Sequence, residues 1–174
     1  GPVAAVKLRL RDIPEMQYLH TNNPPQGEVC FWGPICMSGY FKNEEKTKEA
    51  IHGDGWILSG DVAKINPDMS ITIFDRAKNI FKLSQGEYIA PEKLENVYVQ
   101  SRWVAQAFVY GDSLRDYCVM FAVLNMETAH KWAKETGAEI NEALVKSQDF
   151  VMMVYTDMMA SANQNKLNSL ERPK

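Results

Sequence analysis

The stretch that decides the fold runs from residue 54 to residue 95 and reads DGWILSGDVAKINPDMSITIFDRAKNIFKLSQGEYIAPEKLE. Residues 70–74 alternate polar and apolar side chains as a strand does, and they lead directly into the charged pair Asp75-Arg76. A second short apolar run follows at Ile80-Phe81, then a glycine loop, and then Pro91, which is favoured in the first turn of a helix. This order predicts charged groups at a junction between two bodies.

The residues before the junction predict mostly β-structure, with one short helix that Asn43 would cap. Lys7, Arg9 and Arg11 alternate with apolar residues, which is typical of a half-buried strand. In chain order we expect a strand over 3–10, a loop over 13–26, a strand over 27–32, a helix from 44 to about 51, and a hairpin of 57–65 with 70–74.

The residues after the junction predict a small α+β body. We expect a helix over 91–101, strands over 104–110 and 118–124, and helices over 127–136, 141–146 and 150–162. The favoured boundary lies at residues 76–79, which divides the chain into domains 1–77 and 78–174. The predicted fold class is mixed α/β: a β-rich, barrel-like end of a larger domain, followed by a small α+β domain.

Composition excludes several classes of protein. The chain has 174 residues, 45% hydrophobic and 24% charged, with a net charge of −3, which is a globular balance with no basic surface for nucleic acid. No apolar run approaches the roughly 20 residues that span a bilayer, and the start of the chain does not read as a signal peptide. The cysteines at 30, 36 and 118 have no metal or disulfide spacing, and the three histidines are scattered, so we expect an intracellular protein without a metal site.

The long stretch resembles the signature of the acyl-activating, adenylate-forming enzymes, and within them the long-chain fatty acyl-CoA synthetases. Their pattern runs roughly D-G-W-L-x-T-G-D-x-G-x-W-x-P-x-G-x-L-x-I-I-D-R-K-K. Asp54-Gly55-Trp56, Gly60-Asp61 and Asp75-Arg76 match it, and residues 81–95 are closer still to the long-chain branch. A match of this length is far more specific than a short glycine motif. Departures from the pattern include Ser59 for Thr, Ile65 for Trp, Met69 for Gly and Ala77 for Lys, which leave room for an altered acyl preference or rate.

The resemblance implies that Asp61 and Arg76 bind the ribose of ATP or AMP. A carboxylate can accept hydrogen bonds from two adjacent hydroxyls, and a guanidinium is a permanently charged planar donor. The alternatives are a turn aspartate that satisfies its own backbone and a surface arginine paired with Asp75, which itself reads as a structural partner.

The resemblance also implies a hinge and a loop. Lys78 would be the hinge about which the small domain rotates between the two half-reactions, and the alternative is an exposed loop lysine. Lys82 would face the adenylate at the thioester stage, Gly86 would permit close backbone approach, and Glu87 and Tyr88 would border the CoA channel. The alternative is an ordinary glycine turn between hairpin strands.

The function implied for the parent protein is that of a ligase that makes fatty acyl-CoA from fatty acid, ATP and CoA through an acyl-adenylate, with Mg²⁺ bound outside this chain. We find no phosphate-cradling loop, and residues 167–174 resemble the segment before the family's final lysine motif. The chain therefore reads as the C-terminal part of a synthetase, lacking an upstream domain and cut before that lysine. We expect it to be inactive alone, in a cytoplasmic setting or peripherally on a cytoplasmic membrane face.

Two rival interpretations stay open. One is another adenylate-forming enzyme, against which the run from Phe81 to Glu92 argues. The other is a non-catalytic interaction module whose binding face is the methionine-rich helix, although such a stripe more often packs in a core. The methionines of that stripe are Met152, Met153, Met158 and Met159.

Overall fold

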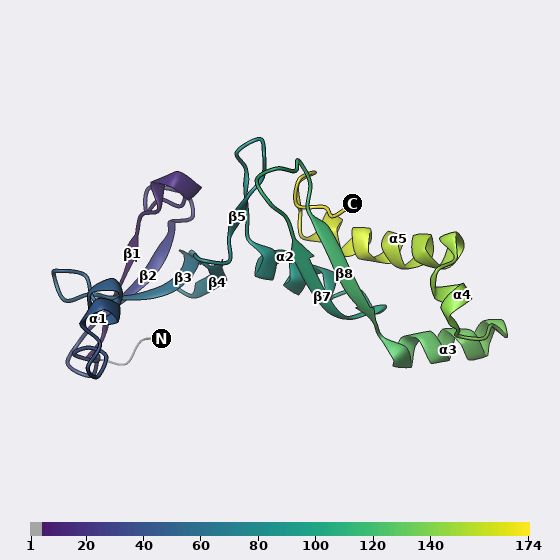
Figure 1. Cartoon of the computed structure of the whole chain (residues 1–174), viewed down its shortest axis with the longest axis horizontal. Coiled ribbons are helices and arrows are strands. Elements are labelled where there is room, and N and C mark those ends of the chain that lie inside the picture. The colour runs from purple at the N-terminus through teal and green to yellow at the C-terminus, as the bar shows by residue number, and fades with distance from the viewer. Residues whose placement is uncertain (1–4) are drawn as a thin grey trace. The chain divides into compact units, whose positions relative to one another are not determined.

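A computed structural model describes residues 5–174, and most of its helices and strands are labelled in Figure 1. The chain divides into two compact units, the first ending at Ile80 and the second running from Phe81 to Lys174. Each unit has its own sheet structure and its own buried residues, so each is described by itself. Across the described residues the fold is mixed α/β, with three antiparallel sheets and five α-helices.

The first unit is built on a four-stranded antiparallel sheet. Its strands are β1 (Lys7–Arg11), β2 (Gln26–Trp32), β3 (Ile57–Ile65) and β4 (Ile71–Arg76), and they lie side by side in chain order. The buried side chains of β2 and β3 form the centre of this unit, because these two strands have a partner on each side. They include Val29, Cys30, Val62 and Ala63.

The barrel-like character predicted for this part of the chain is wrong. A barrel closes only when its first and last strands pair. Within residues 5–80 the sheet is open, with β1 and β4 as its two edges. The alternation of the strands predicted their pairing, but periodicity along single strands carries no information about closure.

The other predictions for the first unit differ from the structure mainly at element ends. Residue 3, where the first strand was expected to start, lies outside the described residues, and β1 is half-buried, as expected. Residues 13–26 contain one turn of 3-10 helix, Pro14–Met16, inside the expected loop. Helix α1 (Glu44–Ala50) is capped as predicted, because the Asn43 side chain accepts a hydrogen bond from the Lys46 N–H.

The second unit combines two short hairpins with four helices. Its strands are β5 (Phe81–Lys82), β6 (Tyr88–Ile89), β7 (Val104–Tyr110) and β8 (Val119–Leu124), and β5 pairs with β6 as β7 pairs with β8. Its helices are α2 (Pro91–Tyr98), α3 (Met126–Thr136), α4 (Glu142–Val145) and α5 (Gln148–Gln164). Gly137 ends α3 in the left-handed conformation, as the sequence predicted.

The core of the second unit lies where α2 and α5 meet the β7–β8 hairpin. Leu94 and Tyr98 of α2 are fully buried there, together with Met158 of α5. A second cluster joins Trp103, Trp132 and Phe150, whose rings meet edge to face at centroid distances of 5.4–6.0 Å. The methionine stripe of α5 therefore serves mainly in packing: Met158 is buried, Met153 and Met159 pack against the two clusters, and Met152 is exposed.

No helix among residues 5–174 combines the length and the apolar character needed to cross a bilayer.

Candidate functional site

Asp61 and Arg76 lie directly opposite one another on neighbouring strands. Asp61 of β3 and Arg76 of β4 are register partners, and Arg76 Nε lies 3.0 Å from Asp61 Oδ1. The Asp61 side chain is 26% exposed and that of Arg76 is 52% exposed, so both polar ends reach solvent. A cross-strand pair of opposite charge at a sheet edge presents one carboxylate and one guanidinium to the same ligand.

A backbone distortion places this pair at the surface. Gly60, just before Asp61, has a φ of +76°, a region that glycine enters far more readily than other residues. The register between β2 and β3 shifts here, because Glu28 faces Val62 while Cys30 faces Leu58. Three residues of β3 thus stand opposite Val29 alone, which is an enlarged β-bulge. The bulge turns the backbone at Gly60 and Asp61 out of the regular ladder.

Asp75 has a structural position, as the sequence analysis expected. The residue is fully buried, and its Oδ1 accepts a hydrogen bond from the backbone N–H of Arg76 at 2.6 Å. Its carboxylate therefore fixes the backbone that carries the Arg76 guanidinium.

Lys78 occupies an exposed turn of the first unit. The turn covers residues 77–79 and follows β4. It is anchored at both ends, because the Ala77 N–H donates to the Gly60 carbonyl at 2.8 Å and the Asn79 N–H donates to the Arg76 carbonyl at 2.9 Å. The Lys78 side chain is exposed in this turn.

The residues predicted for the thioester-stage loop share one hairpin of the second unit. Lys82 of β5 pairs with Tyr88 of β6, and the Lys82 ammonium lies 5.3 Å from the centre of the Tyr88 ring. Gly86 sits in the connecting turn with a φ of +97°. Glu87 is exposed, and its carbonyl accepts the Leu83 N–H at 2.8 Å. The structure thus has the hairpin that the alternative interpretation described, with the candidate side chains on it.

The sequence analysis missed Glu28 and Arg11. Glu28 is only 4% exposed, and its carboxylate accepts hydrogen bonds from the Gly60 N–H at 3.0 Å and from Arg11 Nε at 2.9 Å. A signal was present: an acid beside Gly27 at the start of an apolar strand, and an arginine ending the strand before it. A charged residue inside a buried strand requires a partner.

The described residues contain no group of three or more acidic, histidine or cysteine side chains arranged to bind a metal. Two histidines instead hold neighbouring aspartates: His20 Nδ1 lies 2.8 Å from Asp12 Oδ2, and His52 Nδ1 lies 2.9 Å from Asp54 Oδ1. All three cysteines are unbridged.

Solved structures with the same arrangement are parts of larger enzymes. The adenylation domain of a carboxylic acid reductase from Segniliparus rugosus, in complex with AMP, shares 32% identity over 98% of this chain, with a TM-score of 0.81. The corresponding domain from Mycobacterium chelonae shares 31%, with a TM-score of 0.79. This chain spans 25% of each of those chains. It is therefore a segment of the adenylate-forming superfamily.

Curated sequence relatives define the branch. The chain is 42% identical to fatty acyl-CoA synthetase B of Dictyostelium discoideum over 99% of its length, and 40% identical to long-chain fatty acid–CoA ligase 6 of Rattus norvegicus over its whole length. It spans about a quarter of those relatives, 26% and 25%. No protein-family profile matches it. The chain is thus homologous along its length to one quarter of the long-chain fatty acyl-CoA synthetases, as its motifs predicted.

Proposed function

We propose that this chain is part of a long-chain fatty acid–CoA ligase, and that it contains residues that bind the ribose of the nucleotide and the hinge between two domains. In the proposed reaction, the fatty acid carboxylate displaces pyrophosphate from ATP and forms an acyl-adenylate. The CoA thiol then attacks the acyl carbon, AMP leaves, and fatty acyl-CoA results. Residues 1–77 would end the large domain, and residues 78–174 would form most of the small one.

The observation that carries this proposal is the Asp61–Arg76 pair. A carboxylate can accept hydrogen bonds from the two vicinal hydroxyls of a ribose, and a neighbouring guanidinium orients that carboxylate. The 3.0 Å ion pair and the partial exposure of both side chains provide such a grip. A relative solved in complex with AMP supports a nucleotide as the ligand of the parent enzyme.

The remaining assignments follow from position. Lys78 would be the hinge, since it is exposed and sits in a turn whose neighbours are held by backbone hydrogen bonds. Lys82, Gly86, Glu87 and Tyr88 would border the acyl-adenylate and CoA at the thioester stage, because they share one hairpin. Mg²⁺ would be bound outside this chain in the parent enzyme, as the resemblance to the synthetases implies.

A chimeric enzyme tests the proposal. Residues 1–174 would replace the homologous quarter of the rat ligase, to which they align in full. We expect this chimera to form palmitoyl-CoA from palmitate, ATP and CoA. Asp61→Asn should raise KM for ATP by about tenfold or more, because a charge-assisted hydrogen bond to the ribose is weakened. KM for palmitate should change little.

Asp68→Asn is the matched control. Asp68 lies in the β3–β4 turn on the same hairpin as Asp61, is exposed, and accepts hydrogen bonds from the backbone N–H and the hydroxyl of Ser70. This variant should leave KM for ATP unchanged. Equal KM values for Asp61→Asn and the unmodified chimera would contradict the ribose role. Turnover by the 174-residue chain alone would contradict the proposal that it is inactive without its upstream domain.

The rival adenylate-forming reading has some structural support, since carboxylic acid reductase domains match at 31–32% identity. The sequence favours the ligase branch, which includes relatives that are 40–42% identical over 99–100% of this chain. The interaction-module reading has less support, because most of the methionine stripe packs in the core. Failure of the chimera to adenylate any of a panel of carboxylic acids would favour the interaction module.

A further inference from the structure

A buried carboxylate lies next to the Asp61–Arg76 pair, because it accepts a hydrogen bond from Gly60, the residue before Asp61. Glu28 of β2 is 4% exposed, and its side chain points toward β3 at the bulge, where Oε1 accepts the Gly60 N–H at 3.0 Å. Its other oxygen, Oε2, accepts Arg11 Nε at 2.9 Å across the β1–β2 pairing. A buried carboxylate is strongly unfavourable unless such partners are present. Its two bonds therefore connect β2 to both of its neighbouring strands, to β1 through Arg11 and to the bulge of β3 through Gly60.

The bulge residue Gly60 has both of its backbone groups fixed. Its N–H donates to Glu28, and its carbonyl accepts the Ala77 N–H at 2.8 Å. Gly60 precedes Asp61, and Ala77 follows Arg76. The backbone at Gly60, called the Gly60 corner below, thus connects the buried Glu28 carboxylate to the two residues of the ion pair.

We propose that Glu28 is a positioning residue for nucleotide binding: by holding the Gly60 corner it aligns the Asp61 carboxylate with the Arg76 guanidinium. This inference rests on the proposed function of that pair. Glycine at a φ of +76° is intrinsically mobile, and the regular strand ladder is interrupted here. Without Glu28, the Gly60 N–H and the Arg11 guanidinium would lose their acceptor, and the corner would relax.

The negative charge of Glu28 and its ability to accept the Gly60 hydrogen bond can be tested separately. A glutamine at position 28 retains an oxygen that can accept the Gly60 N–H, but it loses the ionic attraction to Arg11. Glu28→Gln should therefore disturb the corner less than Glu28→Ala does. This graded order distinguishes loss of the Gly60 hydrogen bond from loss of charge.

Nuclear magnetic resonance of the full 174-residue chain provides two readouts. The first is the Arg76 Nε–H resonance without nucleotide, which reports the ion pair and is assigned by its change in Asp61→Asn. The second is titration with AMP, followed at the Asp61 and Arg76 backbone amides. We expect Glu28→Ala to move the Arg76 resonance toward its position in Asp61→Asn, and to weaken AMP binding by about tenfold. Glu28→Gln should give smaller changes in both.

Val29→Ala controls for a general loss of stability. Val29 is the next residue on β2, is 4% exposed, and points to the opposite face of the strand from Glu28. It should lower the melting temperature while leaving both readouts unchanged. An Arg76 resonance that is unmoved in Glu28→Ala would overturn the inference. If that resonance moves as expected while the unmodified chain shows no AMP-dependent shifts at Asp61 or Arg76, the positioning role stands and the ribose role fails.

Discussion

Met69 holds a backbone conformation that suits glycine better. It lies in the turn between β3 and β4 with a φ of +65°, and the related synthetase pattern has glycine at this position. A non-glycine residue in the left-handed region destabilises the folded state by roughly 1–2 kcal/mol. Replacing it with glycine removes this strain, but it also raises the conformational entropy of the unfolded chain, which offsets part of the gain in stability. We expect Met69→Gly to raise the free energy of unfolding by about 0.5–1 kcal/mol in urea titrations. Met69→Ala keeps the Cβ atom and should show no such gain.

The three thiols differ in reactivity. Cys30 and Cys118 are buried, and burial raises the pKa of both thiols, whereas Cys36 is partly exposed. Because the thiolate is the reactive form, a raised pKa together with burial slows alkylation. We expect iodoacetamide to modify Cys36 first in the native chain, and the other two only in denaturant. Mass spectrometry locates the label; rapid modification of native Cys36→Ser would contradict this expectation.

At the scale of single residues, the sequence was informative where it matches the motif of the synthetases. The family resemblance, rather than the strand pattern, assigned Asp61 and Arg76 to one ligand, and the structure brings the two side chains to 3.0 Å from one another. Glu28 was missed because its partner Gly60 lies 32 residues away, at a bulge that no periodicity reveals. Bulges depend on pairing between strands, which a single sequence does not display.

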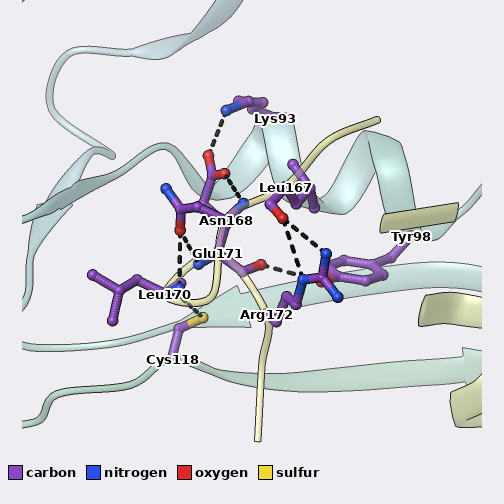
Figure 2. Close-up of polar contacts among 8 residues, drawn as sticks. All are labelled: Lys93, Tyr98, Cys118, Leu167, Asn168, Leu170, Glu171 and Arg172. Carbon is purple, nitrogen blue, oxygen red and sulfur yellow. Dashed lines mark hydrogen bonds and ion pairs between the residues drawn. The ribbon is translucent and has the colours of Figure 1, made fainter. Parts of the chain in front are cut away.

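At the scale of elements, residues 167–172 form a clip that returns the chain to α2 (Figure 2). The Glu171 carboxylate forms an ion pair with Lys93 of α2 and accepts the Asn168 N–H at 2.9 Å. The Glu171 carbonyl accepts the Tyr98 hydroxyl at 3.1 Å, and Arg172 donates to the Leu167 carbonyl at 3.0 and 3.2 Å. Cys118 Sγ reaches the Leu170 carbonyl at 3.5 Å, which attaches the clip to the start of β8.

We expect Glu171→Ala to lower the stability of the second unit by about 1–2 kcal/mol, because the Lys93 ammonium and the Asn168 N–H lose the mostly buried carboxylate that accepts their hydrogen bonds. The expected loss of stability is modest because the Lys93 side chain is 40% exposed, so solvent screens its charge. Glu142→Ala is the control: it removes an ion pair with Lys146 in which both side chains are largely exposed, and it should change stability by less than about 0.5 kcal/mol. Equal urea midpoints for the two variants would contradict a stabilising clip.

Element types could be predicted well, and element ends less well. Helix α2 stops at Tyr98 rather than at residue 101, because the chain turns there and the Ser101 hydroxyl bonds to Asp157 of α5 at 2.6 Å. Helix α5 starts at Gln148 rather than at residue 150, because Ser147 caps it by accepting the Phe150 N–H. Strand β6 has only two residues, too few for any periodicity. Tertiary contacts and caps, rather than propensity, fix these ends.

At the scale of the whole molecule, each of the two units buries residues of its own. Val62 and Cys30 are buried within the first unit, and Leu94 and Tyr98 within the second. The change of pattern after residue 76 led the sequence analysis to place a boundary at 77/78, while the structure divides at 80/81.

Because the two units bury different residues, we expect a cavity made in one unit to destabilise that unit alone. Val62→Ala should remove packing from the β2–β3 centre, and Leu94→Ala from the α2 face; both positions are 0% exposed. Large-to-small substitutions of this kind cost about 2–5 kcal/mol for Leu, and less for Val. Hydrogen exchange followed by mass spectrometry should show faster exchange in peptides from residues 5–80 for Val62→Ala, and from residues 81–174 for Leu94→Ala. Faster exchange across both ranges in either variant would mean that the chain unfolds as one cooperative body. A hinge at Lys78 would then have no independent units to join, and the proposed rotation would lose its physical basis.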